Sequence, residues 1–277
     1  MLLQWAALTT ACQLLKERIV SLPAYDGYIF DLDGTVYLGD LVLPGAIDLF
    51  SKLRSDGRRV AFLSNNPTKN RAQYIEKLTK MGIVVTLDEM INSSYVMVQW
   101  LLANAPSATL YVVGEAPLIG ELEAAGFRLS EQAGQIDIVV VSFDRTFAYR
   151  KLQIAFDAIR AGARMVATNP DRYCPMPGGG EPDAASMIAA IEACTNTRCE
   201  VNVGKPSPIM ARTVSAALQL PPERCLMIGD RLMTDIAMGA AAGMDTALVL
   251  TGDSTRAEVA QALHPPTYIL DDLRALL

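Results

Sequence analysis

The chain has 277 residues, 51% of them apolar, and a formal charge of −6 at pH 7 from 24 basic and 30 acidic side chains. This length and apolar content predict a globular protein of one large domain or two ordinary ones. The acidic balance, without a basic run, argues against a nucleic-acid or anionic-membrane partner. Because His264 is the only histidine, a two-histidine zinc site is excluded and histidine-based catalysis is disfavoured.

The first fifteen residues are mostly apolar and resemble the apolar stretch of an export signal. They lack a basic start and are followed by Lys16, Glu17 and Arg18, so we interpret this segment as an amphipathic helix. No apolar run reaches the roughly 20 residues that a membrane span needs. The five cysteines form no CxxC pair, which argues against a disulfide framework or thiolate metal site and favours the cytoplasm.

Short apolar runs and helical patterns alternate along the rest of the chain. In chain order we predict a strand at 28–30, a helix at 44–55, a strand at 59–63, a helix at 70–81, a short strand at 90–92 and a helix at 94–102, then strands at 110–113, 138–141, 165–167, 201–203, 226–228 and 247–250, most of them separated by helices. This alternation predicts an α/β fold with a doubly wound, Rossmann-like parallel sheet. Ligands of such sheets bind beyond the carboxyl ends of the strands.

Two polar stretches, at 104–107 and 196–198, suggest domain boundaries. Between them lie three strand-helix units and a run of three glycines. We therefore predict an inserted α/β domain over residues 104–199, within a core formed by 1–103 and 200–277, with edges uncertain by about ten residues.

The strand at 28–30 leads into two aspartates, Asp31 and Asp33, followed by Gly34. Because strand side chains alternate with period two, both carboxylates project to the same side. An ordinary strand followed by a turn would give the same local pattern. A calcium-binding EF-hand loop needs glycine at its sixth position and glutamate at its twelfth. Here Gly34 is fourth and Val42 is twelfth, so that loop is excluded.

A second acidic group, Asp230 and Asp235, follows the strand at 226–228. Parallel strands end at the same edge of a sheet, so Asp230 is expected near Asp31 and Asp33. Crowded carboxylates favour a hard divalent cation, and Mg²⁺ is the one we predict. Asp235 falls in the first turn of the next helix, where capping of backbone amides and support of the metal site are both open.

Polar side chains able to hold a phosphate follow two other strands. Ser64, Asn65 and Asn66 come after the strand at 59–63, and Lys205 precedes a helix that starts with proline. Each of these side chains alone is most often ordinary solvated surface. Their order along the chain, together with the two acidic groups, favours a phosphate site.

Four motifs in this order resemble those of the haloacid dehalogenase superfamily. They are Asp31-Leu32-Asp33-Gly34-Thr35, Ser64, Lys205 and Gly229-Asp230…Thr234-Asp235. The stretches at 64–66, 168–171 and 203–208 more narrowly resemble its class IIA, which carries a large α/β cap between the second and third motifs. That class contains NagD-type phosphatases, 4-nitrophenylphosphatases, phosphoglycolate phosphatases and pyridoxal phosphate phosphatases. The resemblance extends from about residue 28 to residue 252.

The resemblance implies a phosphatase in which Asp31 attacks the phosphorus and Asp33 is the general acid and base. It implies Mg²⁺ held by the side chains of Asp31 and Asp230 and the backbone carbonyl of Asp33. The implied phosphate-binding residues are Ser64 and Lys205, together with Asn65 and Asn66 through the amides around them. Thr35 and Asp235 are implied to support these residues without touching the substrate.

The inserted domain is then expected to select the substrate. By resemblance, residues 169–176 hang over the site and offer Asp171, Arg172, Tyr173 and Cys174, and replacement of Arg172 by alanine is expected to change substrate preference. Small phosphorylated metabolites suit such a capped site, and sugar phosphates, phosphoglycolate, glycerol phosphates and pyridoxal phosphate all stay open. A homodimer formed through the cap is implied by the resemblance only.

Other phosphate sites fit the sequence less well. Lys205 is followed by proline rather than serine or threonine, so it does not belong to a P-loop, and the glycine run at 178–180 lacks the spacing of a dinucleotide fingerprint. A phospho-accepting switch of the receiver-domain type, or a non-catalytic phosphate-binding protein, remains as the alternative. The chain length, the inserted domain and Asp33 disfavour it.

Overall fold

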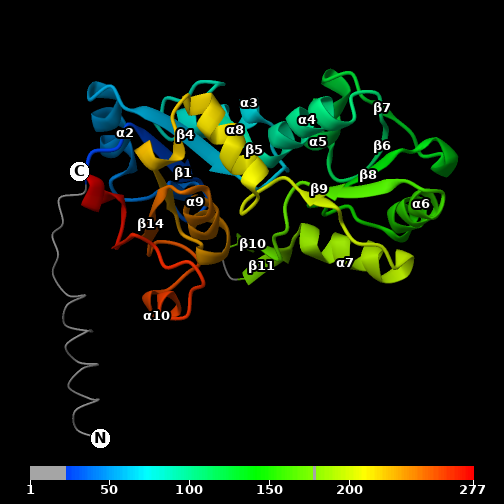
Figure 1. The fold of residues 1–277 in the computed structure, drawn as a ribbon. Helices are drawn as coiled ribbons and strands as arrows, with labels where there is room; N and C mark the ends of the chain where they lie inside the picture. The colour runs from blue at the N-terminus through cyan, green and yellow to red at the C-terminus, as the bar shows by residue number, and fades with distance from the viewer. Residues whose placement is uncertain (1–22, 177–178) are drawn as a thin grey trace, which may run out of the picture.

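The computed structural model describes residues 23–176 and 179–277. Two parallel sheets lie in two adjacent lobes, with helices packed on both faces of each (Figure 1). This confirms the predicted α/β class with a Rossmann-like sheet and an inserted α/β unit. The amphipathic helix expected at the start of the chain lies outside the described residues. No helix among the described residues is long and apolar enough to cross a membrane.

The first sheet has six strands in the order β15-β14-β13-β1-β4-β5, all parallel. Their bounds are β1 (Gly27–Asp31), β4 (Arg59–Ser64), β5 (Met90–Asn92), β13 (Cys225–Gly229), β14 (Asp245–Val249) and β15 (Tyr268–Leu270). The first strand of this sheet in the chain, β1, lies inside the sheet. The next two, β4 and β5, are added on one side of it, and β13, β14 and β15 are added later on the other side. That change of direction beside β1 is where sheets of this kind bind ligands.

Side-chain alternation divides the central strands between two hydrophobic clusters. Ile29 of β1 packs on one face, whereas Tyr28 and Phe30 pack on the other. The face that Ile29 joins is covered by α4 (Ser93–Asn104), α8 (Pro208–Leu218) and α9 (Ala237–Ala242), and the opposite face by α2 (Ala46–Ser55) and α3 (Arg71–Lys80). A short helix, α10 (Arg256–Val259), follows β14.

The second sheet has five parallel strands in the order β12-β9-β8-β6-β7. The strands are β6 (Thr109–Val113), β7 (Arg128–Leu129), β8 (Ile138–Val141), β9 (Arg164–Ala167) and β12 (Val201–Asn202), and the accompanying helices are α5 (Ala116–Ala124), α6 (Tyr149–Arg160) and α7 (Ala184–Thr195). We call this lobe the cap. The domain edges at 104 and 199 stay predictions; β12 lies just beyond the second of them.

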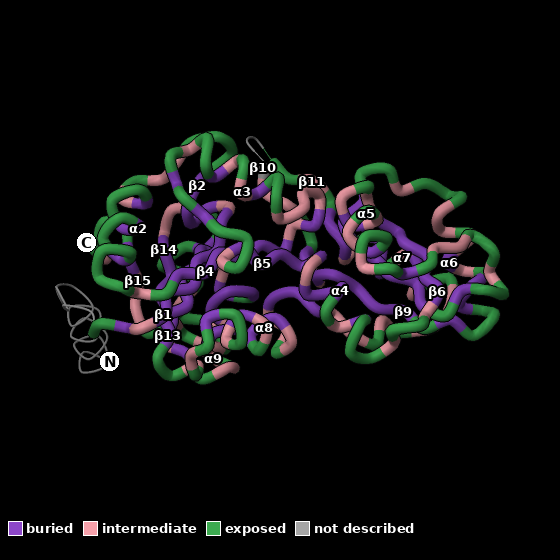
Figure 2. Tube along the Cα trace, turned by 90° about the horizontal axis from the view of Figure 1, so that it is seen from above, coloured by how far each residue is buried: buried purple, intermediate pink, exposed green. Residues whose placement is uncertain are grey.

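The two lobes share one hydrophobic cluster. It contains Ile29 of the first sheet, Val140 of the cap sheet and Leu101 of α4, which contacts both α5 and α8. Figure 2 shows this buried part of the chain running through both lobes. The cap therefore packs on the core through apolar side chains as well as through its two chain connections.

Most predicted elements are present within one or two residues, and β5 and β8 have the predicted bounds. The helix expected from residue 44 starts at Ala46, because Gly45 adopts a positive φ of 85° that does not continue a right-handed helix. The sequence patterns did not predict β7, β15 or the two antiparallel hairpins. These hairpins pair β2 (Tyr37–Leu38) with β3 (Leu41–Val42), and β10 (Tyr173–Met176) with β11 (Gly179–Pro182).

Candidate active site

Three neighbouring strands of the first sheet bring polar residues to one edge. In β1 Phe30 is opposite Ile228 of β13, and Asp31 is opposite Leu63 of β4. The three strands therefore end at the same edge of the sheet. Asp31 and Ser64 are the last residues of β1 and β4, and Asp230 directly follows β13. This is the arrangement that the alternating strand pattern predicted.

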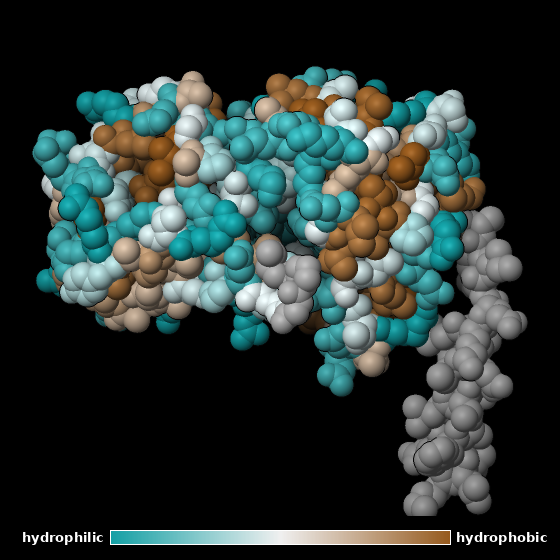
Figure 3. All heavy atoms as spheres, turned by 180° about the vertical axis from the view of Figure 1, so that it is seen from behind, coloured by the Kyte–Doolittle hydropathy of each residue, from teal (hydrophilic) through white to brown (hydrophobic). Residues whose placement is uncertain are grey.

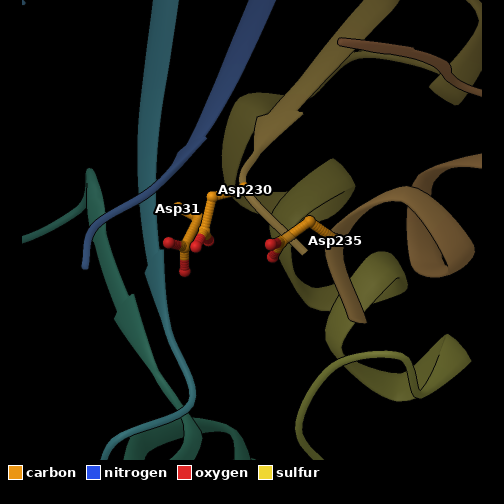
Figure 4. Close-up of side chains that lie close together, drawn as sticks. All are labelled: Asp31, Asp230 and Asp235. Carbon is orange, nitrogen blue, oxygen red and sulfur yellow. The ribbon is translucent and has the colours of Figure 1, made fainter. Parts of the chain in front are cut away.

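Three aspartates form a buried acidic cluster at this edge. Carboxylate oxygens of Asp31, Asp230 and Asp235 all lie within 4.8 Å of one another. Figure 4 shows Asp31 beside Asp230, with the carboxylate of Asp235 directed toward them from a separate segment. That segment is a one-turn π-helix over Leu232–Ile236. It brings Asp235 so close to Gly229 that an added Cβ there would lie 2.3 Å from the Asp235 side chain, which explains the glycine.

Lys205 supplies the positive charge of this cluster. Its Nζ contacts Oδ1 of Asp31 and lies 2.7 Å from Oδ1 of Asp235. The side chain is 3% exposed. Burial alone would lower the pKa of Lys205, but the two carboxylates outweigh burial and raise it. The ammonium is therefore a fixed cation beside the carboxylate that was predicted to attack phosphorus.

The same cluster has the character of a divalent-cation site. Oδ2 of Asp230 accepts a hydrogen bond of 2.7 Å from the backbone amide of Asp253, whereas its buried Oδ1 has no partner among the described atoms. Burial raises the pKa of Asp31 to about 7, against the influence of Lys205. Burial and the charge of Asp31 likewise raise the pKa of Asp230. Buried oxygen ligands that repel one another suit Mg²⁺.

Asp33 stands apart from the acidic cluster and faces the cavity between the lobes. The hydroxyl of Tyr37 donates a hydrogen bond of 3.3 Å to its Oδ2. Burial raises the pKa of the Asp33 carboxyl, although Lys77 opposes the shift. Its side chain therefore faces the cavity as a carboxyl group that keeps its proton more readily than a free aspartate does.

The last residue of β4, Ser64, and Asn66 in the loop after it lie near the strand end, as expected. The Ser64 hydroxyl lies 3.0 Å from the hydroxyl of Tyr74 and accepts a hydrogen bond from the Asn66 amide at 3.1 Å. The Asn66 side chain donates to Sγ of Cys174 at 3.6 Å and accepts from the amide of Thr68 at 2.9 Å. Both residues line the cavity beside Asp31.

Asn65 connects three segments of the chain instead of presenting its side chain to a ligand. Its Oδ1 accepts from the Lys205 amide at 2.8 Å, and its Nδ2 donates to the Lys205 carbonyl at 3.0 Å and to Oδ2 of Asp171 at 2.9 Å. An added Cβ on Gly204 would lie 2.7 Å from this Oδ1. The Asn65 side chain therefore fixes the backbone that carries Lys205, and the phosphate contact expected of the amides around Asn65 stays a prediction.

The supporting role expected of Thr35 stays a prediction. Thr35 is fully buried, and its hydroxyl has no hydrogen-bond partner among the described atoms. Asp235 accepts a hydrogen bond from a backbone amide, one of the two roles left open, while its support of a metal site stays a prediction. Its Oδ2 accepts from the Arg231 amide at 3.1 Å while its Oδ1 binds Lys205.

The cap contributes to the site through the segment before and within β10. Asp171 is buried against Asn65, and the Tyr173 hydroxyl donates to Oδ1 of Asp253 at 2.6 Å. Tyr173 and Cys174 line the cavities, whereas Arg172 is exposed and, within the described chain, is absent from their walls. The effect of Arg172 on substrate preference stays a prediction.

Two connected cavities lie between the lobes. A small one of about 40 Å³ adjoins Asp31, Ser64 and Lys205. It shares Asp33 and Cys174 with a larger one of about 660 Å³. Figure 3 shows the hollow between the lobes, bordered mainly by hydrophilic residues. The size fits a phosphate in the inner cavity and a small organic group in the outer one.

Several residues of the site carry no recognisable signal in the sequence. Tyr37 and Tyr74 hold Asp33 and Ser64 through their hydroxyls, and Lys69, Lys77 and Arg145 line the larger cavity. Isolated tyrosines and lysines in helices and hairpins are usually core or surface residues. Only the packing of the lobes identifies these.

Comparison with known proteins agrees with this geometry. Residues 28–128 match the model of the haloacid dehalogenase-like hydrolases, and residues 202–276 match a second model of HAD-like hydrolases. The sugar-phosphatase AraL of Bacillus subtilis is 38% identical over 248 residues, which are 90% of each chain. The chain belongs to the haloacid dehalogenase-like hydrolases. It is a phosphatase of the NagD-like class within that family.

Other relatives of this hydrolase support the same assignment. An acid sugar phosphatase of Staphylococcus saprophyticus is 33% identical over 91% of this chain and 97% of its own. The crystal structure of a 4-nitrophenylphosphatase from Thermotoga maritima aligns with a TM-score of 0.87 and 33% identity, covering 94% of this chain and 98% of that one. NagD of Escherichia coli K-12 aligns with a TM-score of 0.83 and 28% identity over 90% and 97% of the two chains.

Proposed function

We propose that this phosphatase hydrolyses a small phosphorylated sugar or a similar metabolite, with Asp31 as the nucleophile and Mg²⁺ as the cofactor. The observation that carries the proposal is the position of Asp31. It ends the central strand, contacts Lys205 and lies within 4.8 Å of Asp230. The sugar phosphatases among the relatives support the substrate class.

The Asp31 carboxylate attacks phosphorus and forms an aspartyl-phosphate, which divides one difficult displacement into two easier ones. Asp33 protonates the oxygen of the leaving alcohol. It then removes a proton from the water that cleaves the intermediate, so the residue is restored at the end of each cycle. The hydrogen bond from Tyr37 keeps the Asp33 carboxyl facing the cavity.

Lys205 and Ser64 hold the non-bridging oxygens of the phosphoryl group, together with the backbone amides around Asn66. Asn65 fixes the Lys205 backbone, and Asp235 holds its ammonium. Such donors stabilise developing charge best when they are already in position, because no reorganisation is then required.

The residues that would hold Mg²⁺ are Asp31 and Asp230 through their side chains and Asp33 through its backbone carbonyl. The buried, unpartnered Oδ1 of Asp230 supports this assignment. When bound, the ion neutralises phosphoryl charge and orients the reacting oxygens.

Tyr173 and Cys174 of the cap are the residues we assign to substrate selection, because both line the cavity beside Asp33. A homodimer formed through the cap is part of the proposal and can be checked by light scattering. A cytoplasmic location is also proposed. It is supported by Cys174, Cys194, Cys199 and Cys225, which are free thiols in the described chain, with Cys194 exposed.

The decisive test measures release of phosphate from 4-nitrophenyl phosphate with Mg²⁺ in the wild type and in Asp31→Asn. We expect the substitution to lower kcat by about a thousandfold or more, because it removes the nucleophile. Asp40→Asn is the matched control, since Asp40 lines the same cavity away from the acidic cluster.

Two results would contradict the proposal. One is turnover by Asp31→Asn at the wild-type rate. The other is a wild-type protein that accumulates a stable acyl phosphate without releasing phosphate, which is the behaviour of a phospho-accepting switch.

A further inference from the structure

The larger cavity contains two lysines that the proposed chemistry does not use. Lys69 precedes α3 and Lys77 lies within it, and both line the cavity together with Asp33. Nζ of Lys77 lies 3.6 Å from the centre of the Tyr37 ring, whose hydroxyl is 3.3 Å from Oδ2 of Asp33. One aromatic ring therefore separates this cation from the residue that protonates the leaving alcohol.

Among the described residues neither lysine forms a direct ion pair with a carboxylate, and Asp33 and Asp40 are the acids whose charges act on Lys77. Among the described residues the ion-paired lysines are Lys80, Lys151 and Lys205. Lys69 and Lys77 are both partly buried. Burial lowers the pKa of Lys77, the charges of Asp33 and Asp40 oppose this shift, and the charge of Lys69 adds to it. Two like charges near each other in a partly buried wall are stabilised when an anion binds between them.

The acidic residues of the same cavity mostly have other partners. Glu181 is 4.0 Å from Arg145, and Asp253 accepts a hydrogen bond from Tyr173. Arg145 itself is held at 2.7 Å by Glu115 and so adds little free positive charge. Asp40 also lines the cavity and its charge acts on Lys77, but no ion pair joins the two residues. An anion entering from the phosphate site would therefore meet Lys69 and Lys77 without having to break an ion pair.

We propose that Lys69 and Lys77 bind a second anionic group, a carboxylate or a second phosphate, on the alcohol side of the substrate. The inference rests on the proposed function and narrows its substrate class. The preferred substrates are phosphomonoesters that carry a further negative charge, and neutral sugar monophosphates are poorer ones. The volume of about 660 Å³ leaves room for such a group beyond the phosphate.

The test compares substrates that differ only in this group. 3-Phosphoglycerate carries a carboxylate where glycerol 3-phosphate carries a hydroxymethyl group, and fructose 1,6-bisphosphate has a second phosphate that fructose 6-phosphate lacks. For each pair the wild type is expected to show the higher kcat/KM for the more anionic member. The double variant Lys69→Met/Lys77→Met is expected to reduce that ratio about tenfold or more, mainly through KM, because charge-assisted bonds to the anion are lost.

Lys80→Met is the matched control. It removes the same charge from α3, but Lys80 is 73% exposed, pairs with Glu76 and does not line the larger cavity. Its substrate ratios should equal those of the wild type. Using ratios cancels any effect of Lys77 on the chemical step itself, which alters both members of a pair equally.

Hydrolysis of 4-nitrophenyl phosphate tests the proposed function separately from the inference about Lys69 and Lys77, because its leaving group bears no carboxylate or second phosphate. If the wild type fails to hydrolyse it with Mg²⁺, the proposed function fails and the inference fails with it. If the wild type hydrolyses it but prefers the less anionic members of the pairs, only the inference is overturned. The same conclusion follows if the folded double variant keeps the wild-type ratios.

Discussion

Lys205 is the residue that allows several carboxylates to be buried together. Its ammonium contacts both Asp31 and Asp235, and it is itself almost completely buried. A buried ion pair adds little net stability compared with apolar packing, but loss of one partner leaves an uncompensated charge. Lys205 therefore matters for folding as well as for binding phosphate.

Replacement of Lys205 by methionine should lower the free energy of unfolding by about 3–5 kcal/mol at neutral pH. Without the ammonium, the pKa of Asp31 rises further, so its ionised form becomes more costly in the folded state as pH increases. The loss measured by urea denaturation should therefore be larger at pH 8 than at pH 5. An equal loss at both pH values would contradict this account, and Lys80→Met should show no loss at either.

Asp230 gives a second prediction at the same scale. Mg²⁺ that binds the folded protein raises its unfolding temperature, by an amount equivalent to about 2.7 kcal/mol when the ion is at 100 times its Kd. Asp230→Asn removes a ligand and also one of the mutually repelling charges. The variant should be more stable than the wild type in EDTA and should lose most of the rise on addition of Mg²⁺. A thermal melt with and without Mg²⁺ measures both effects, and a full Mg²⁺ response in the variant would exclude Asp230 as a ligand.

At the scale of single elements, the start of α7 carries a buried acid at its N-cap. Oδ1 of Asp183 accepts hydrogen bonds from the Ala184 amide at 2.5 Å and from Nδ2 of Asn169 at 3.0 Å. Burial nevertheless raises the pKa of Asp183 to about 6. The helix cap is therefore formed by a carboxyl group that is costly to ionise in the folded protein.

Because the folded pKa lies above the unfolded one, the folded protein holds more protons than the unfolded chain between about pH 4 and pH 6, and this contribution to stability is lost as pH rises through 6. Asparagine at position 183 keeps an oxygen for both hydrogen bonds without the charge. Asp183→Asn should match the wild type near pH 4 and exceed its stability by about 1–3 kcal/mol at pH 7.5. Urea denaturation at the two pH values measures the difference.

Asp272 serves as a control, because its pKa is shifted in the opposite direction. It also caps a short helix, but its hydrogen bonds with Arg274 lower its pKa. Its contribution to stability is present above the unfolded pKa and lost as pH falls, so Asp272→Asn should gain nothing at pH 7.5. The raised pKa assigned to Asp183 would be contradicted if Asp272→Asn stabilised the protein at pH 7.5, or if Asp183→Asn did not.

At the scale of the whole molecule, the cap and the core are joined by one hydrophobic cluster. Leu101 of α4 is fully buried within it, and α4 contacts α5 of the cap and α8 of the core. Domains that share such an apolar interface are expected to unfold together rather than independently.

Calorimetry should therefore show one unfolding transition, with the calorimetric and van't Hoff enthalpies in agreement. Leu101→Ala, which leaves a cavity at the junction, should lower stability by about 2–5 kcal/mol. A second, separate transition in the wild type would show that the lobes unfold independently. Leu102→Ala is a suitable control, because that neighbouring side chain is exposed.

The sequence by itself determined the sheet and the ends of its strands. Alternating apolar runs identified β1, β4 and β13, and the residues that follow them placed Asp31, Ser64 and Asp230 at one edge. Such inferences succeed because strand period and parallel alignment are regular, local properties of the backbone. The order of the motifs was sufficient to predict the enzyme family.

Only the tertiary structure decided how the rest of the site is assembled. It showed that the Asn65 side chain supports the Lys205 backbone, and it placed Tyr37 and Lys77 beside Asp33. These positions depend on how a hairpin, a helix face and the cap pack against one another. Contacts of that kind join residues far apart in the chain, and they leave no periodic pattern in the amino-acid sequence.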